Sequence, residues 1–182
     1  SDRRTLCVST QVGCAYGCKF CASGLDGFKR DLVPSEIIDQ VLATERWRKA
    51  QGGANGWPVN NLVIMGMGEP LDNLGPVVDA LRLMTAPEAM RISTRKVTVS
   101  TSGLVDKINE FQQENIHINL AISLNATDDR TRDRLMPINK KYPIKALMDC
   151  LKNYPLKPQR RHTIEYVLME GINDSDEDAR RL

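Results

Sequence analysis

Three cysteines near the start of the chain stand in the spacing Cys14-x3-Cys18-x2-Cys21, and thiolates gathered in this way can bind metal. The glycines interleaved with them are Gly13, Gly17 and Gly24. Glycine permits the positive φ angles that a loop needs to wrap around a metal cluster. A 4Fe–4S cube has four irons, so three cysteines leave one iron open to a small ligand.

A structural zinc site is the alternative for this loop. Closed zinc sites take four ligands, and the only two histidines, His117 and His162, are distant in the sequence. On spacing alone, Cys7 stays open as a fourth ligand. The gaps of three and two residues do not pair as zinc knuckles do, which favours a cluster. The fifth cysteine, Cys150, lies among leucines of an expected helix and is assigned to the core.

The composition describes one globular domain over residues 1–182. The chain is 41% hydrophobic and 26% charged, which excludes a disordered, collagen-like or coiled-coil protein. No apolar run is long enough to span a membrane, and the first residues lack the apolar segment of a signal peptide. An odd cysteine count argues against a disulfide framework. We therefore expect a cytoplasmic protein with no membrane partner.

Short β-rich runs alternate about five times with helical patterns. Strands are expected at residues 5–12, 61–65, 96–99, 116–124 and 163–169. Helices are expected from residue 34 to about 47, at 76–85, 104–115 and 144–154, and from 174 onward. The inner face of the first helix is expected to carry Ile37, Ile38, Val41, Leu42 and Trp47. This alternation predicts an α/β fold with a mostly parallel sheet, either open or curled into a partial barrel.

In such folds, ligands bind at the carboxyl ends of the strands. The segments that follow the expected strands are residues 13–24, 66–72, 100–103 and 123–125. Any site should therefore be built from these four segments.

The cysteine loop, with Phe20 just before its last cysteine, resembles that of the radical S-adenosylmethionine (SAM) enzymes. Five further motifs resemble, more narrowly, the radical SAM methyltransferases that modify carbon 2 of adenine in 23S rRNA and tRNA. They are Cys7-Val-Ser-Thr-Gln-Val-Gly-Cys14, Gly66-Met-Gly-Glu-Pro70, Val99-Ser-Thr-Ser-Gly103, Pro137-Ile-Asn-Lys-Lys-Tyr142 and Thr163-Ile-Glu-Tyr-Val167. The motifs run in order across nearly the whole chain, so together they are specific although each alone is weaker.

This resemblance implies a partial (βα) barrel of the radical SAM type, with a 4Fe–4S cluster and SAM as cofactors. The cluster ligands it implies are Cys14, Cys18 and Cys21. The SAM-binding residues it implies are Gly68, Glu69, Ser100, Ser123, Leu124 and Asn125. The family often has His at the position of Asn125, whose amide keeps one donor and one acceptor but cannot titrate.

Simpler alternatives exist for three of the residues that the resemblance singles out. Glu69 is also placed to cap the helix after Pro70, and Ser100 to cap a helix N-terminus. For Cys7 the resemblance implies a catalytic role, in which this cysteine resolves a covalent protein–RNA adduct by forming a disulfide. The alternative for Cys7 is a small apolar side chain buried in a strand.

The resemblance also implies a mechanism. Carbon 2 of adenine is not a nucleophile, so ordinary methyl transfer from SAM is blocked. In the family, one SAM methylates a cysteine near the C-terminus, and a second SAM yields a radical that takes hydrogen from that methyl group. The methylene radical then adds to carbon 2, and an external donor such as a flavodoxin supplies electrons.

This chain has no cysteine after Cys150 and lacks the family's upstream helical region. We therefore expect a core that binds the cluster and SAM but does not alone methylate RNA. The alternatives are a non-catalytic metal module that binds RNA and a radical SAM enzyme that acts on another substrate.

The net charge of +2 conceals an uneven distribution. Ten basic and two acidic residues lie between Arg130 and Arg161, which gives +8 in 32 residues. The remaining 150 residues therefore carry −6. This basic segment is a candidate contact for 23S rRNA or tRNA, and an ordinary solvated face is the alternative. A monomer is expected.

Overall fold

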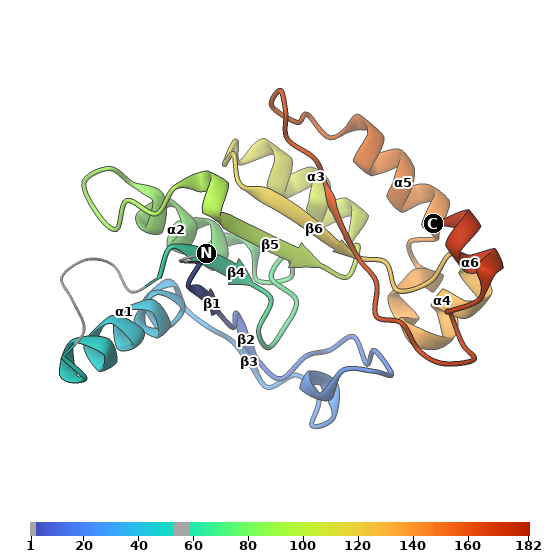
Figure 1. Ribbon diagram of the computed structural model, residues 1–182, viewed down its shortest axis with the longest axis horizontal. Coiled ribbons are helices and arrows are strands. Elements are labelled where there is room, and N and C mark those ends of the chain that lie inside the picture. The colour runs from blue at the N-terminus through green and yellow to red at the C-terminus, as the bar shows by residue number, and fades with distance from the viewer. Residues whose placement is uncertain (1–2, 53–58) are drawn as a thin grey trace.

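The computed structural model describes residues 3–52 and 59–182, and a parallel sheet forms its centre (Figure 1). The sheet contains β1 (Thr5–Cys7), β4 (Asn61–Ile64), β5 (Val97–Thr101), β6 (Asn119–Ser123) and β7 (Thr163–Glu165). Its strand order is β1-β4-β5-β6-β7, and all four pairings are parallel. The expected α/β fold with a mostly parallel sheet is confirmed.

Helices connect the consecutive strands, because parallel neighbours need a crossover. They are α1 (Pro34–Ala50), α2 (Leu74–Thr85), α3 (Val105–Gln113), α4 (Asp129–Leu135) and α5 (Ile144–Asn153). Helix α6 (Asp176–Arg181) follows the last strand. Short 3₁₀ turns occur at η1 (Ala22–Gly24), η2 (Thr94–Lys96) and η3 (Pro137–Lys140). Strands that follow in sequence order with right-handed crossovers place their helices on one face, which is how a barrel winds. None of the helices in the described part of the chain is long and apolar enough to cross a membrane.

The core lies between the sheet and these helices. Leu62, Val99, Leu120 and Ile122 from the strands are buried, and so is Leu81 of α2. Consecutive buried residues in β6 are typical of a strand covered on both faces. Cys150 of α5 is partly buried and packs against this core, as expected.

The expected strand at residues 5–12 is wrong in its second half. The chain leaves the sheet after Cys7, and β2 (Gln11–Val12) pairs antiparallel with β3 (Arg30–Asp31) in a separate ribbon. Asn73 fixes this departure, because its side-chain amide donates to the carbonyls of Thr10 and Leu32. The ribbon carries the cysteine loop, which Figure 1 shows on the side toward which the strand arrows point.

Two further expectations about helices fail. Trp47 is 66% exposed, because the last turns of α1 extend past the sheet, whereas Ile37 and Val41 are buried as expected (Figure 1). Helix α4 has no counterpart among the expected helices. It has one apolar residue, Leu135, and its periodicity is therefore weak; the Asp128 side chain caps it by accepting from the Thr131 N–H.

Candidate active site

A cavity of about 300 Å³ opens at the carboxyl ends of the strands. The predicted site residues that line it are Cys14, Cys18, Cys21, Gly68, Glu69, Ser100, Ser123 and Asn125. Leu124 is the exception among the residues predicted for SAM: its side chain is buried in the core beside the cavity. Four segments predicted separately from the sequence therefore meet at one place.

The ribbon and the turn after β4 hold the cysteine loop over this cavity. The Met67 carbonyl accepts from the N–H groups of Thr10 and Gln11. Gly13 has φ +79°, and a Cβ at this position would stand 1.9 Å from the carbonyl oxygen of Gly27. The loop therefore requires glycine here. On its far side, the Lys19 N–H donates to the Leu135 carbonyl of α4 at 2.9 Å.

The three thiols of the loop are partly buried and near one another. Burial raises the pKa of the Cys14 thiol and raises that of Cys18 to about 11, and the neighbouring thiolates Cys14 and Cys21 add to the shift at Cys18. A bound metal cluster would offset both effects, because it takes thiolates as ligands and releases their protons.

The donor set fits a cluster better than a single zinc ion. Among the described residues, no three His, Cys, Asp or Glu side chains converge in a group that would hold one metal ion. Thiolates of a 4Fe–4S cube bind separate irons and need not converge, whereas the four ligands of closed zinc do. Cys7 does not line the cavity, and both histidines precede strands, at the opposite edge of the sheet. The proposed fourth zinc ligand is therefore absent from the described part of this site.

Glu69 is a buried carboxylate held by the end of β5. Its Oε2 accepts from the Ser102 N–H at 2.7 Å and the Ser102 hydroxyl at 2.8 Å, and its Oε1 accepts from the Leu71 N–H at 3.1 Å. Burial raises the pKa of Glu69, while the bonds from Ser102 oppose the rise. The alternative of helix capping does not apply, because α2 begins only at Leu74 and Glu69 bonds none of its first-turn N–H groups.

Gly68 sets the position of Glu69. Its φ is +101°, and a Cβ here would stand 2.5 Å from the Cβ of Gln11. The Gln11 side chain in turn accepts from the Glu69 N–H at 2.8 Å. The turn after β4 is therefore locked against the ribbon that carries the cysteines.

Ser100 and Ser123 share an acceptor that the sequence did not single out. Glu165, the last residue of β7, accepts from the Ser100 hydroxyl at 2.5 Å and the Ser123 hydroxyl at 3.0 Å through Oε2. The register places Ser123 opposite Glu165, and all three side chains line the cavity. The expected strand at 163–169 is wrong in its second half, because β7 ends at Glu165. The available signal for Glu165 was therefore only its place inside the motif at 163–167.

Asn125 is buried and has a left-handed backbone, with φ +57°. Asparagine tolerates this conformation better than most residues. Its Oδ1 accepts from the Val167 N–H at 2.9 Å, and its carbonyl accepts from the Asn173 side chain. The residue therefore ties the end of β6 to the segment after β7.

Arg132 corrects the picture of the basic segment. It belongs to the run that we expected to contact RNA, yet it is 0% exposed and donates to four oxygens inside the protein. Lys140 and Lys141 of the same run are exposed. Arg132 is therefore not part of the candidate RNA-binding surface, because its side chain is buried inside the protein.

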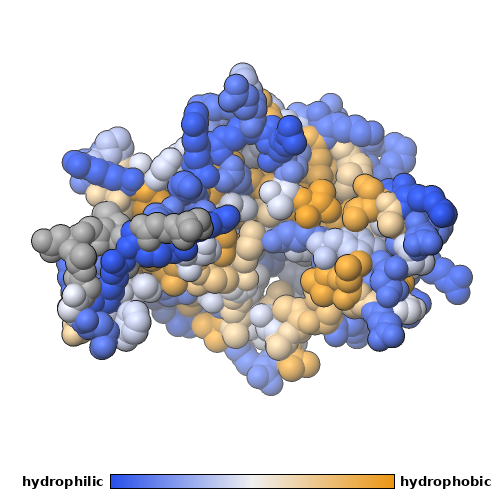
Figure 2. Space-filling view, viewed as in Figure 1, coloured by the Kyte–Doolittle hydropathy of each residue, from blue (hydrophilic) through white to orange (hydrophobic). Residues whose placement is uncertain are grey.

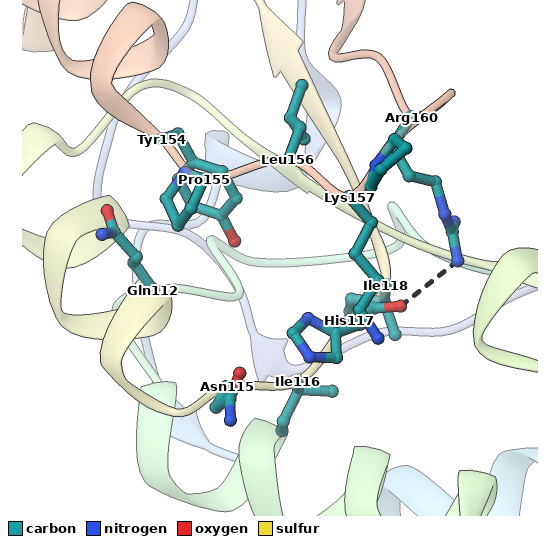
Figure 3. A pocket seen from close by; sticks show the side chains of 11 residues that line it. Gln112, Asn115, Ile116, His117, Ile118, Tyr154, Pro155, Leu156, Lys157 and Arg160 are labelled. Carbon is teal, nitrogen blue, oxygen red and sulfur yellow. Dashed lines mark hydrogen bonds between the residues drawn. The ribbon is translucent and has the colours of Figure 1, made fainter.

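Cys7 is exposed at the end of the edge strand β1, which contradicts the alternative of a buried apolar side chain. A separate cavity of about 360 Å³ lies at the amino ends of the strands (Figure 3). Its lining includes His117 and Lys157, and Arg160 there donates to the His117 carbonyl. None of the predicted site residues belongs to this second cavity.

Comparison with known proteins gives a consistent result. The family model described as "Radical SAM superfamily" matches residues 8–182. The chain is 51% identical over 181 residues to the dual-specificity RNA methyltransferase RlmN of Syntrophotalea carbinolica, covering 100% of this chain and 46% of that protein. For the protein of that name from Geotalea uraniireducens, the identity is 52%, over 100% of this chain and 50% of that protein.

The crystal structure of a radical SAM methyltransferase from Sphaerobacter thermophilus superposes with a TM-score of 0.89 at 43% identity. The match covers 99% of this chain and 52% of that one. The chain therefore spans about half the length of these relatives.

Proposed function

The chain belongs to the radical SAM superfamily, whose members in general use SAM and a 4Fe–4S cluster, and on this premise we propose that it is the cluster- and SAM-binding core of an RNA methyltransferase. The proposed reaction is methylation of carbon 2 of adenine in 23S rRNA and tRNA. One observation carries the proposal: the three thiols, Glu69, and the Ser100–Ser123–Glu165 group line a single cavity. The relatives named RNA methyltransferases support the choice of substrate class.

In this proposal Cys14, Cys18 and Cys21 hold the cluster, which when bound supplies an electron for reductive cleavage of SAM. Glu69 accepts from the ammonium of SAM, since a buried carboxylate forms strong bonds to a cationic donor. Its bonds from Ser102 keep it oriented before SAM binds. The turn at Gly68 brings backbone close enough to contact the ligand.

The strand ends orient the rest of the SAM molecule. Ser100, Ser123 and Glu165 present two hydroxyls and a carboxylate, a combination that suits the ribose hydroxyls. Asn125 and the backbone of Leu124 complete this side of the cavity. The apolar lining, which includes Phe20 and Ile64, limits the water that reaches the reacting groups.

Cys7 is the proposed resolving cysteine. Its thiol is exposed, so a second thiol and an RNA adduct can reach it. The proposed partners are RNA, bound in part by the basic segment, and an external electron donor such as a flavodoxin. We further propose that the chain is one core domain of a cytoplasmic, monomeric protein.

Anaerobic reconstitution followed by EPR tests the core of this proposal. We expect about four irons and four sulfides per chain, and a reduced cluster whose EPR spectrum changes when SAM is added. Cys18→Ala should abolish the cluster, while Cys150→Ala, which changes a cysteine away from the cavity, should retain it. Stoichiometric zinc without labile sulfide would instead identify a non-catalytic metal module.

A further inference from the structure

Arg132 is a fully buried guanidinium that lies where the ends of β5 and β6 meet. Its Nε donates to the Leu124 carbonyl at 3.0 Å. One of its terminal nitrogens, Nη2, donates to the carbonyls of Ser102 at 2.7 Å and Ser123 at 3.2 Å. These carbonyls follow β5 and β6 on the rim of the cavity. The side chain therefore joins the two strand ends that carry the proposed SAM contacts.

All of these acceptors are neutral, so the hydrogen bonds satisfy the guanidinium without cancelling its charge. Helix α4 also carries two acids, Asp129 and Asp133. The side-chain amide of Asn139 lies between these carboxylates and Arg132. Asn139 accepts from Arg132 Nη1 at 2.9 Å, while its own Nδ2 donates to Asp133 at 2.7 Å and Asp129 at 3.0 Å. Asn139 thus stands between the cation and the carboxylates that would otherwise pair with it.

The uncancelled charge lies next to the cysteine loop. The Lys19 N–H donates to the Leu135 carbonyl, one turn after Arg132 on α4. Burial lowers the pKa of Arg132 to about 10, and among the acids that raise it again, Cys18 acts more strongly than Asp129 or Asp133. A buried cation without an ion pair is unfavourable unless a negative group completes the site. The cysteine loop is where such a group would bind.

We propose that Arg132 supplies the interior positive charge that balances a thiolate-ligated iron–sulfur cluster on Cys14, Cys18 and Cys21, and that this charge raises the reduction potential of the cluster. The inference rests on the proposed function. Adding an electron makes the cluster more negative, and a nearby cation stabilises that state. Because Arg132 is buried, water and salt screen its charge much less than they screen a surface charge.

Redox titration with dithionite, followed by EPR of the reduced cluster, tests this in the reconstituted protein. Arg132→Met should shift the midpoint potential to more negative values. Arg134→Met is the matched control, because Arg134 carries the same charge on the same helix but is exposed. It should leave the potential unchanged. A purely structural Arg132 would alter stability without moving the potential in a fixed direction.

A second variant leaves the guanidinium and its bonds in place, since Arg132→Met deprives three carbonyls of a donor. Asp133→Asn removes a nearby negative charge, and its side-chain oxygen still accepts from Asn139. It should shift the potential to more positive values, opposite in sign to Arg132→Met. The Asp133→Asn shift shows only that the potential responds to charge at this place. If Arg132→Met takes up no cluster, Arg132→Gln decides, because its amide still donates hydrogen bonds but carries no charge: a potential more negative than that of the wild type supports the role of Arg132, and an unchanged potential overturns it.

The possible failures are distinguishable. A normal SAM-responsive cluster whose potential is the same in the wild type, Arg132→Met and Asp133→Asn would overturn the role of Arg132 alone. Wild-type protein that takes up no iron and sulfide would overturn the proposed function, and this inference with it.

Discussion

Glu69 and Glu165 line the same cavity, but their hydrogen-bond partners differ in kind. Glu69 accepts from two backbone N–H groups and one hydroxyl, so its position is fixed by the fold. In the described part of the chain, the carboxylate of Glu165 accepts from the hydroxyls of Ser100 and Ser123, which can rotate. Glu165 can therefore exchange a serine donor for a ligand hydroxyl without any backbone movement.

The Glu165→Gln variant should lose SAM affinity. The charge-assisted bond to a ribose hydroxyl becomes an ordinary one, which corresponds to a loss of about 10-fold in affinity. Anaerobic calorimetry on the cluster-loaded protein measures the effect. Glu170→Gln is the control, since Glu170 is exposed beyond the same strand. Equal affinities for the wild type and Glu165→Gln would remove Glu165 from the SAM site.

The sequence predicted the residues whose chemistry depends on local spacing. The three cysteines lie within eight positions, and Gly68 and Glu69 are adjacent, so short motifs suffice. Glu165 and Arg132 depend instead on distant partners. Glu165 meets Ser100 from 65 residues away, and Arg132 meets Ser102 from 30 residues away. Only the register of the sheet and the burial of α4 reveal these roles.

At the scale of the elements, apolar runs in the sequence predicted the strands of the sheet but not the point where the chain leaves it. The positions of β4 and β6 were predictable from continuous apolar stretches, because both strands are covered on two faces. The break after Cys7 depends on Asn73, whose amide bonds segments that are distant in sequence. Helix α4 is stabilised by a cap and by the bonds of Arg132, and neither produces an apolar period.

Helix α6 should have an acid-sensitive attachment. Asp178 accepts from the hydroxyls of Ser175 and Thr127 and from Arg181, and these bonds lower its pKa below the ordinary value of 3.8. A lowered pKa in the folded state means that the stabilisation is complete above pH 3.8. It is lost as the pH falls through the folded-state value.

Thermal unfolding of the metal-free protein at a series of pH values measures this attachment. Asp178→Asn should be less stable than the wild type at pH 7, and the difference should shrink below pH 4. Asp176→Asn, an exposed acid on the same helix, is the control and should show no such convergence. A stability difference independent of pH would show that Asp178 does not act through its charge.

At the scale of the whole molecule, the structure divides the basic segment between interior and surface. Arg132 is internal, and Arg160 donates to the His117 carbonyl at the amino-end cavity. Lys145 and Lys141 lie on the surface and pair with Asp149 and Asp106. Lys140 and Lys141 are exposed at the end of η3.

The surface shown in Figure 2 is largely hydrophilic, with apolar patches toward the cysteine loop and the segment after β7. Phe20, Leu25 and Leu168 are exposed in these two segments. A substrate at the cavity would therefore meet both apolar and cationic groups.

Charge reversal at Lys140 and Lys141 tests whether this surface binds a phosphate backbone. Each phosphate contact contributes close to one unit to the slope of log affinity against log salt, so Lys140→Glu with Lys141→Glu should reduce its magnitude by about 1–2 units. The control is Arg46→Glu with Lys49→Glu on α1, which makes the same change in net charge on exposed side chains. Figure 1 shows α1 at the opposite end of the molecule from α4. Binding of a tRNA probe across a salt series measures both variants. A slope that changes equally in both would reflect net charge alone, and an unchanged slope at Lys140 and Lys141 would make this face an ordinary solvated surface.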